Sequence, residues 1–211
     1  MKPASLIQGA GQIPSGSLFI SGWAGYPLLF PVFSAQCNFF LPLIQDADEN
    51  LEPILSRSWK TVFAWSLGAH LCLKHLNRLR ADRLVLIAPF LDFCQGTSAE
   101  KIKDMLRSLD NNPQATVRWF WKACAVKQPP KPPVDQAHAL KKGLELLIHS
   151  RVEQSSLATH LPVTLIHGLA DRIVPPATSE NIKSCLPRAC CRYVPYGHYI
   201  PEPEILNAIQ Q

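Results

Sequence analysis

The sequence predicts an α/β protein, with a mostly parallel central sheet flanked by helices and one helical insertion. Three observations predict it. Short apolar runs rich in β-forming residues recur along the chain, and such continuous runs are typical of strands buried on both faces of a parallel sheet. Helix-like stretches alternate with these runs, which favours strand–helix–strand units. Between the fourth and fifth runs lies a long segment that has helical patterns but no convincing strand.

The elements of the predicted core follow from these patterns. Strands are expected near Ser17–Ser21, Asn38–Leu41, Thr61–Trp65, Leu84–Ala88, Val163–His167 and Arg192–Pro195. Core helices are expected at about Leu67–Leu79, Ala177–Cys185 and Glu202–Ile209. Right-handed crossovers would connect the parallel strands.

The insertion is expected at residues 92–158, which leaves residues 1–91 and 159–211 as the core. The capping-box pattern Thr97–Glu100 predicts the start of its first helix. Asn112-Pro113, a cap residue followed by proline, predicts the start of a second. Apolar positions at helical spacing define the inward faces of the two helices: Ile102, Met105, Leu106 and Leu109, then Val117, Phe120, Trp121 and Cys124.

A proline-rich linker, Gln128–Pro133, follows these two helices, and a third helix is expected from about Asp135 to His149. We interpret the whole insertion as a lid.

The composition excludes several classes of protein. The chain has 211 residues, of which 47% are hydrophobic and 18% charged, which is typical of one well-filled domain. No apolar run reaches the roughly 18–20 residues that span a bilayer. The N-terminal residues show no secretory signal pattern, so we expect a cytoplasmic protein without a membrane contact. Seven scattered cysteines without a CxxC pair predict neither a disulfide framework nor a zinc site.

Charge gives a weaker indication. The net charge is +5, and residues 92–158 hold ten Lys or Arg against seven Asp or Glu, an excess of three. An ordinary solvated surface would account for this excess. No basic run or aromatic RNA-binding motif indicates a nucleic-acid partner.

The most informative stretch is Thr61–His70, in which a buried strand runs into Ser66 and a helix begins at once. Ala64-Trp65-Ser66-Leu67-Gly68 matches the nucleophile elbow of α/β-hydrolases, with Ala64 in place of the usual first glycine. The turn is tight, so the residues flanking the serine must be small. The pentapeptide alone is weak evidence for a nucleophile, because a serine that only caps the helix N-terminus would give the same pattern. Its strand–turn–helix context favours a nucleophile.

An elbow of this kind predicts an acid and then a histidine, each on a loop after a later strand. Asp171 follows one apolar strand and a glycine turn, and His198 follows the next strand and another glycine. Asp171 would fix the His198 tautomer, and His198 would take the Ser66 proton. Asp92, which also follows a strand, is the rival acid. The predicted fold is therefore the α/β-hydrolase fold, with a Ser66–Asp171–His198 triad.

Two backbone amides should stabilise the oxyanion. The first is the Leu67 amide, next after the nucleophile. The second should come from the loop after the first strand, where Gly22 lets the backbone approach the site. Trp23 is then the natural donor and Ala24 the near alternative; a plain glycine turn with Trp23 in the core is the other interpretation.

With these motifs, the chain resembles the pimeloyl-acyl-carrier-protein methyl ester esterases of biotin synthesis. The matching pieces are Gly22-Trp23, Trp65–Gly68, the Asp171 and His198 loops, and Gly143–Leu147. The resemblance implies a serine carboxylesterase without a cofactor, in which Ser66 is the nucleophile, His198 the base and Asp171 its orienting acid. It also implies that Trp23 and Leu67 supply the oxyanion amides, and that an acyl carrier protein is the partner.

The acidic carrier would dock on basic lid residues, for which the candidates are Lys101, Lys103, Arg107, Arg118, Lys122 and Lys127. We expect an apolar acyl pocket lined by Trp23, Phe90, Phe120 and Trp121, against the simpler interpretation that these residues only pack the lid onto the body. The alternatives for function are a broader short-chain esterase or thioesterase, and a hydrolase fold used only for binding.

Overall fold

The structure is a computed structural model, and it describes residues 12–42, 47–133 and 136–210. Its centre is a six-stranded sheet in the order β2-β1-β4-β6-β7-β8, in which every neighbouring pair is parallel. The strands are β1 (Leu18–Ile20), β2 (Asn38–Phe40), β4 (Val62–Trp65), β6 (Leu84–Ile87), β7 (Val163–Gly168) and β8 (Cys190–Val194). The predicted parallel sheet is therefore confirmed.

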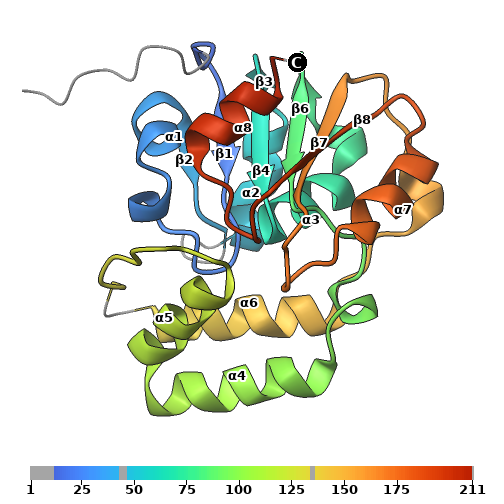
Figure 1. The fold of residues 1–211 in the computed structure, drawn as a ribbon. Coiled ribbons are helices and arrows are strands. Elements are labelled where there is room, and N and C mark those ends of the chain that lie inside the picture. The colour runs from blue at the N-terminus through green and yellow to red at the C-terminus, as the bar shows by residue number, and fades with distance from the viewer. Residues whose placement is uncertain (1–11, 43–46, 134–135, 211) are drawn as a thin grey trace, which may run out of the picture.

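The order of the strands determines which helices cover which face (Figure 1). From β1 the chain passes through α1 (Pro31–Gln36) to the edge strand β2, and it then reverses direction through α2 (Ala47–Leu55) to β4. All later crossovers run on towards β8. Because crossovers are right-handed, this reversal puts α1 on one face of the sheet and the later core helices on the other.

The final helix returns to the face that carries α1. Glu202 begins α8 (Glu202–Ala208), and its buried carboxylate accepts hydrogen bonds from the amides of Val32 (3.1 Å) and Phe33 (2.7 Å) in α1. These bonds satisfy two amides of the first turn of α1, which have no partner within the helix. Helices α1 and α8 are thereby held together (Figure 1).

The reversal between β1 and β4 also creates a site for ligands. These two strands are neighbours, yet the chain leaves β1 towards one face and leaves β4 towards the other. The two outgoing loops therefore diverge and open a crevice at the carboxyl edge of the sheet, which is where open α/β sheets bind their ligands. Trp23 lies on the first of these loops and Ser66 on the second.

Between β6 and β7 the described residues form three α-helices, α4 (Ala99–Asn111), α5 (Pro113–Ala123) and α6 (Ala137–His149). They lie together beyond one end of the strands, below the sheet in the view of Figure 1. Ser98 caps α4 by accepting a bond from the Glu100 amide, and Asn112 caps α5 by accepting one from the Ala115 amide. Both helices begin where they were predicted. The cap of α4 is Ser98, however, and not the Thr97 of the capping-box pattern, whose hydroxyl donates to the Ile173 carbonyl. The third helix was expected from Asp135, which lies outside the described residues.

Some elements differ from the sequence-based prediction. The helix expected over residues 67–79 is α3 (Leu67–Lys74), and a separate 3-10 turn follows it at Leu76–Arg78. His75 separates the two, because its backbone (φ −114°, ψ 25°) is not helical. A small sheet of β3 (Ser58–Trp59) and β5 (Arg80–Ala81) was not predicted, since two-residue strands carry no periodicity. The remaining core helix, α7 (Ala177–Cys185), matches its predicted bounds.

The core of the molecule is continuous across the sheet and reaches into the lid. Phe19 of β1 stacks on Phe33 of α1 with ring centroids 4.5 Å apart, and Trp121 of α5 is fully buried. All seven cysteines are free thiols. Among the residues that the structure describes, no helix is long and apolar enough to cross a membrane.

Candidate active site

Ser66 occupies a strained turn between β4 and α3. Its backbone has φ 54° and ψ −116°, a conformation that non-glycine residues rarely adopt and that is found at sharp strand-to-helix turns carrying a nucleophile. Gly68 permits this turn, because a Cβ there would lie 2.3 Å from the Ile20 carbonyl oxygen and 2.5 Å from that of Ser21. The strain thus orients a serine at the carboxyl edge of the sheet.

The structure brings Ser66, His198 and Asp171 together as a hydrogen-bonded chain. His198 Nε2 lies 2.8 Å from Ser66 Oγ, and His198 Nδ1 lies 2.8 Å from Asp171 Oδ2. Because the carboxylate accepts from Nδ1–H, Nε2 is left as the acceptor for the serine proton. Trp65 helps to fix the backbone of His198, because its indole Nε1 donates to the His198 carbonyl at 2.9 Å.

Asp171 is held as a carboxylate in a buried position. Burial by itself would raise its pKa, but the facing His198, hydrogen bonds from His167 and His198, and the Val174 amide outweigh it, so the pKa lies well below its usual range. Oδ1 accepts from the amides of Ile173 (2.8 Å) and Val174 (2.9 Å). Asp171 therefore remains charged while it orients His198.

Asp92, the rival acid, is engaged elsewhere. One of its carboxylate oxygens accepts from the Cys94 amide at 2.8 Å, and the other pairs with Arg151 at 2.7 Å. It thus caps a turn at the start of the lid and does not contact His198.

The amides predicted to hold an oxyanion lie next to Ser66. The loop after β1 approaches so closely that a Cβ on Gly22 would come within 2.9 Å of Ser66 Cβ. Within the described part of the chain, the backbone amides of Trp23, Ala24 and Leu67 donate to no protein acceptor. Leu67 is the first residue of α3, where amides have no partner inside the helix. Both loops therefore carry amides without an acceptor among the described residues, as an oxyanion site at Ser66 would require.

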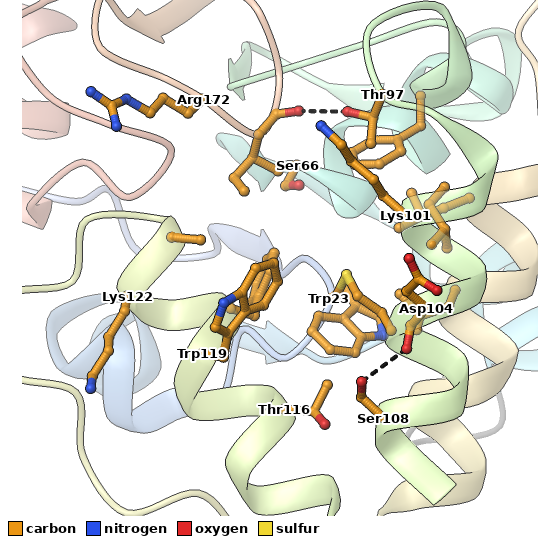
Figure 2. Close-up of a pocket in the computed structure, with 18 of the residues that line it drawn as sticks. Trp23, Ser66, Thr97, Lys101, Asp104, Ser108, Thr116, Trp119, Lys122 and Arg172 are labelled. Atoms are coloured by element: carbon orange, nitrogen blue, oxygen red, sulfur yellow. Dashed lines mark hydrogen bonds between the residues drawn. The ribbon is translucent and has the colours of Figure 1, made fainter.

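A cavity of about 1150 Å³ opens over Ser66 between the core and the lid (Figure 2). Small-molecule sites typically measure about 300–1000 Å³, so this one is large enough for an extended ligand. Its apolar lining comes mainly from the lid and from the loop after β1: Trp23, Ile102, Met105, Trp119, Phe120, Leu144 and Leu147. Its charged lining residues are Lys101, Asp104, Lys122 and Arg172.

Two of the four residues predicted to form an acyl pocket line this cavity. Trp23 and Phe120 do, and they meet edge to face with centroids 4.7 Å apart. Phe90 does not, because its ring stacks on His70 at 4.9 Å, beneath the lid and outside the cavity. Trp121 does not either, because it is fully buried and its Nε1 donates to the Ala24 carbonyl at 2.9 Å.

Several site residues were missed by the sequence analysis. Trp119 lines the cavity although its side chain is 58% exposed, and Arg172 and Ile173 line it directly after the acid. Their adjacency to Asp171 was a signal that could have identified the last two. His167, four residues before the acid, also contacts it, with 3.3 Å between Nε2 and Asp171 Oδ2. The sequence offered only the motif His-Gly-x-x-Asp for that contact.

Comparison with known proteins identifies the fold. No protein-family model and no curated protein sequence matches the chain. Solved structures do match: an esterase from Exiguobacterium antarcticum at TM-score 0.67 and 15% identity, covering 88% of this chain and 86% of that one. A hydrolase from Oleispira antarctica matches at TM-score 0.66 and 10% identity, covering 95% and 89%. A hydrolase from Pseudomonas aeruginosa matches at TM-score 0.65 and 14% identity, covering 95% of this chain and 86% of that one.

These likenesses show that the chain has the α/β-hydrolase fold, as the sequence predicted. At such low identity they show the fold alone, because this fold hosts many different reactions. Within the described ranges, no cluster of three or more His, Cys, Asp or Glu side chains could hold a metal ion. The chemistry therefore has to be argued from Ser66, His198 and Asp171.

Proposed function

We propose that the protein is a cytoplasmic serine carboxylesterase that hydrolyses the methyl ester of pimeloyl-acyl-carrier protein in biotin synthesis, without a cofactor. The observation that supports ester hydrolysis most directly is the chain of two 2.8 Å contacts joining Ser66, His198 and Asp171 at the cavity. A protein that only binds ligands has no need of all three groups in this geometry.

In the first half of the reaction, Ser66 Oγ attacks the ester carbonyl carbon while His198 Nε2 takes its proton. Negative charge develops on the carbonyl oxygen and is stabilised by the amides of Leu67 and Trp23. When the tetrahedral intermediate collapses, the bond to the methoxy oxygen breaks. His198 gives its proton to that oxygen, methanol leaves, and the acyl group stays on Ser66.

In the second half, His198 takes a proton from water, and the hydroxide formed attacks the acyl carbon. The same amides stabilise the second tetrahedral intermediate. His198 then protonates Ser66 Oγ as the acyl bond breaks, and the free carboxylic acid is released. Asp171 stabilises the imidazolium in both halves and stays ionised throughout.

The cavity supports an extended acyl substrate. Its aromatic and aliphatic lining would take an alkyl chain, and its volume of about 1150 Å³ exceeds what an acetyl group would fill. Cationic side chains at its edge would face an acidic carrier protein. Lys101 extends from α4 into the cavity, and Lys122 lies on α5 (Figure 2).

Among the lid residues proposed to contact a carrier, the structure separates two groups. Lys103 and Arg107 already pair with Glu100 and Asp104 of the same helix. The remaining candidates have no ion-pair partner among the described residues: Lys101, Arg118, Lys122 and Lys127. These four are the better candidates for carrier docking, together with Arg172 at the cavity.

A broader esterase or thioesterase is the second candidate function. The same triad would serve it, and the apolar lining of the cavity favours it, because such a lining would take a free ester as well as a carrier-bound one. The two functions differ in what the cavity edge recognises and in which bond is cleaved.

The test compares a pimeloyl methyl ester attached to acyl carrier protein with free dimethyl pimelate. We expect a higher kcat/KM on the carrier-linked ester, with methanol as the product, and loss of several orders of magnitude in Ser66→Ala. Equal kcat/KM on both esters would favour the broader esterase, and cleavage of the thioester would favour the thioesterase. Failure to hydrolyse any ester, with no covalent labelling of Ser66 by a fluorophosphonate, would refute the whole proposal.

A further inference from the structure

His167 is a fully buried histidine that the ester-hydrolysis mechanism does not use. It lies on β7, and its backbone pairs with Tyr193 of β8, so its position is fixed by the sheet. Its ring reaches three groups. Nε2 lies 3.0 Å from the Val174 carbonyl oxygen and 3.3 Å from Asp171 Oδ2, while Nδ1 lies 2.7 Å from Ser179 Oγ of α7.

These contacts determine where the proton sits on the neutral ring. A carbonyl oxygen and a carboxylate can only accept, so Nε2 has to carry the hydrogen. The hydroxyl of Ser179 can donate, and it therefore donates to Nδ1. The Nε2–H thus donates to the Val174 carbonyl, and it lies beside the oxygen of Asp171 that accepts from His198.

His167 consequently holds the acid in two ways. Through its hydrogen bond to the Val174 carbonyl it fixes the turn whose amides donate to Oδ1, and its Nε2 also faces Oδ2 at 3.3 Å. Oδ1 then has two amide donors, and Oδ2 has His198 as its donor with the ring of His167 beside it. Such a carboxylate cannot rotate without losing hydrogen bonds, and in a buried site an unmade hydrogen bond is costly.

We propose that His167 is a positioning residue that fixes the Asp171 carboxylate for His198, so that the catalytic unit is a chain of four residues: Ser66, His198, Asp171 and His167. The role rests on the proposed hydrolysis, because it acts through the base of that reaction. His167 itself does not line the cavity and would not touch the substrate.

Removing this N–H has a predictable sign. A carboxylate that faces one N–H fewer attracts an imidazolium more strongly, so the acid limb of the kcat/KM profile should move to higher pH. Cys124 is another ionisable group near Asp171, and it is fully buried; burial, and then the negative charge of Asp171, keep the pKa of its thiol well above the usual value. The thiol therefore stays neutral and does not obscure the effect.

Two amide substitutions provide a matched pair. His167→Gln can place its N–H near the position of Nε2, within reach of Asp171 and Val174. His167→Asn is one methylene shorter and places its N–H nearer Ser179. Both keep a buried amide of similar polarity. Ser179→Ala breaks the other hydrogen bond of His167 and leaves Asp171 untouched.

The experiment measures the pH dependence of kcat/KM on the best ester, and the titration of the His198 ring by NMR with labelled histidine. In His167→Asn we expect the acid limb to move up by about 0.5–1 pH unit. We also expect kcat to fall about tenfold with KM unchanged. His167→Gln and Ser179→Ala should keep the acid limb of the unmodified protein.

Identical pH profiles in all the variants would overturn the proposal, as would a shift in Ser179→Ala equal to that in His167→Asn. If His167→Asn fails to fold, the inference rests on His167→Gln, whose profile must then match the unmodified protein. The NMR titration needs no substrate, so it tests His167 even if the protein hydrolyses none of the esters offered.

Discussion

Asp171 differs from Asp92 in what its carboxylate faces, although both acids follow a strand of the same sheet. Asp171 is buried and accepts a hydrogen bond from His198, the base. Asp92 instead accepts from the Cys94 amide and forms an ion pair with Arg151. Which acid faces His198 depends on the loop after β7, where the amides of Ile173 and Val174 donate to the Asp171 carboxylate.

Exchanging each acid for its amide tests this assignment. In Asp171→Asn the side-chain nitrogen would donate to His198 Nδ1, so the ring would carry its proton on Nε2 and could not accept from Ser66. We expect kcat to fall roughly 10⁴-fold, measured on a free methyl ester.

Asp92→Asn is the control for that substitution. It weakens an ion pair whose Arg151 side chain is well exposed, and such pairs contribute about 1 kcal/mol or less to the free energy of unfolding. Its kinetics should therefore be close to those of the unmodified protein. If Asp92→Asn lost the activity and Asp171→Asn kept it, the acid would have been misassigned.

At the residue level, the order of residues along the chain was enough to predict the three members of the triad. Ser66, Asp171 and His198 occur in the order expected of this fold, each at the end of a strand, and the structure joins them. The contact from His167 could not be predicted, because it depends on how the turn at 171–174 curls back beneath the strand that precedes it. A buried histidine on a strand looks like any core residue in the sequence.

At the level of elements, α5 shows how one helix serves two purposes. Phe120 and Trp121 are adjacent and lie about 100° apart around the helix. Phe120 faces the cavity, with its ring 6.4 Å from that of His198. Trp121 instead packs against the loop after β1, where its Nε1 donates a hydrogen bond to the Ala24 carbonyl.

This division predicts different effects for two Phe→Leu substitutions. Phe120→Leu removes part of the cavity wall, so we expect KM to rise more for octanoyl than for acetyl esters. Phe90→Leu removes the same atoms from the packing against His70, outside the cavity, so any change in KM should be equal for both chain lengths. Steady-state kinetics on the two esters measures this. Equal effects of Phe120→Leu on both esters would mean that Phe120 only packs the lid.

The sequence predicted the faces of the lid helices only in part. Helical spacing identified Phe120 and Trp121 as inward, but periodicity cannot distinguish a cavity wall from a core. Phe90 illustrates the same limit, because its ring stacks on His70 of α3 and meets Phe93 edge to face, and neither neighbour follows from the sequence pattern. The short strands β3 and β5 and the brief helix α1 carry too few residues for a period to appear.

For the whole molecule, the lid is hydrogen-bonded to the loops of the candidate active site. Among the described residues four hydrogen bonds, each between a lid residue and a core loop, make these connections: Trp121–Ala24, Leu140–Trp23, Cys124–Tyr199 and Thr97–Ile173. The last of them is visible at the edge of the cavity (Figure 2). The loop after β1, the loop that carries His198 and the loop that carries Asp171 are therefore each connected to the lid.

A lid connected in this way makes the cavity edge a fixed surface, and fixed charges on such a surface can steer an acidic partner. Surface steering weakens as salt screens it. We therefore expect kcat/KM for a carrier-linked ester to fall steeply between low and moderate ionic strength. For a small neutral ester it should barely change.

Charge reversal locates the surface responsible. Changing Lys101 and Lys122 to Glu should lower kcat/KM for the carrier-linked ester far more than for the small ester, at fixed salt. Changing Lys183 and Arg188 to Glu is the matched control, since it alters the net charge equally at exposed residues that do not line the cavity. The ratio of kcat/KM for the two substrates is the measurement. If both pairs change this ratio alike, or neither changes it, the lid does not recognise a carrier and the broader esterase is the better assignment.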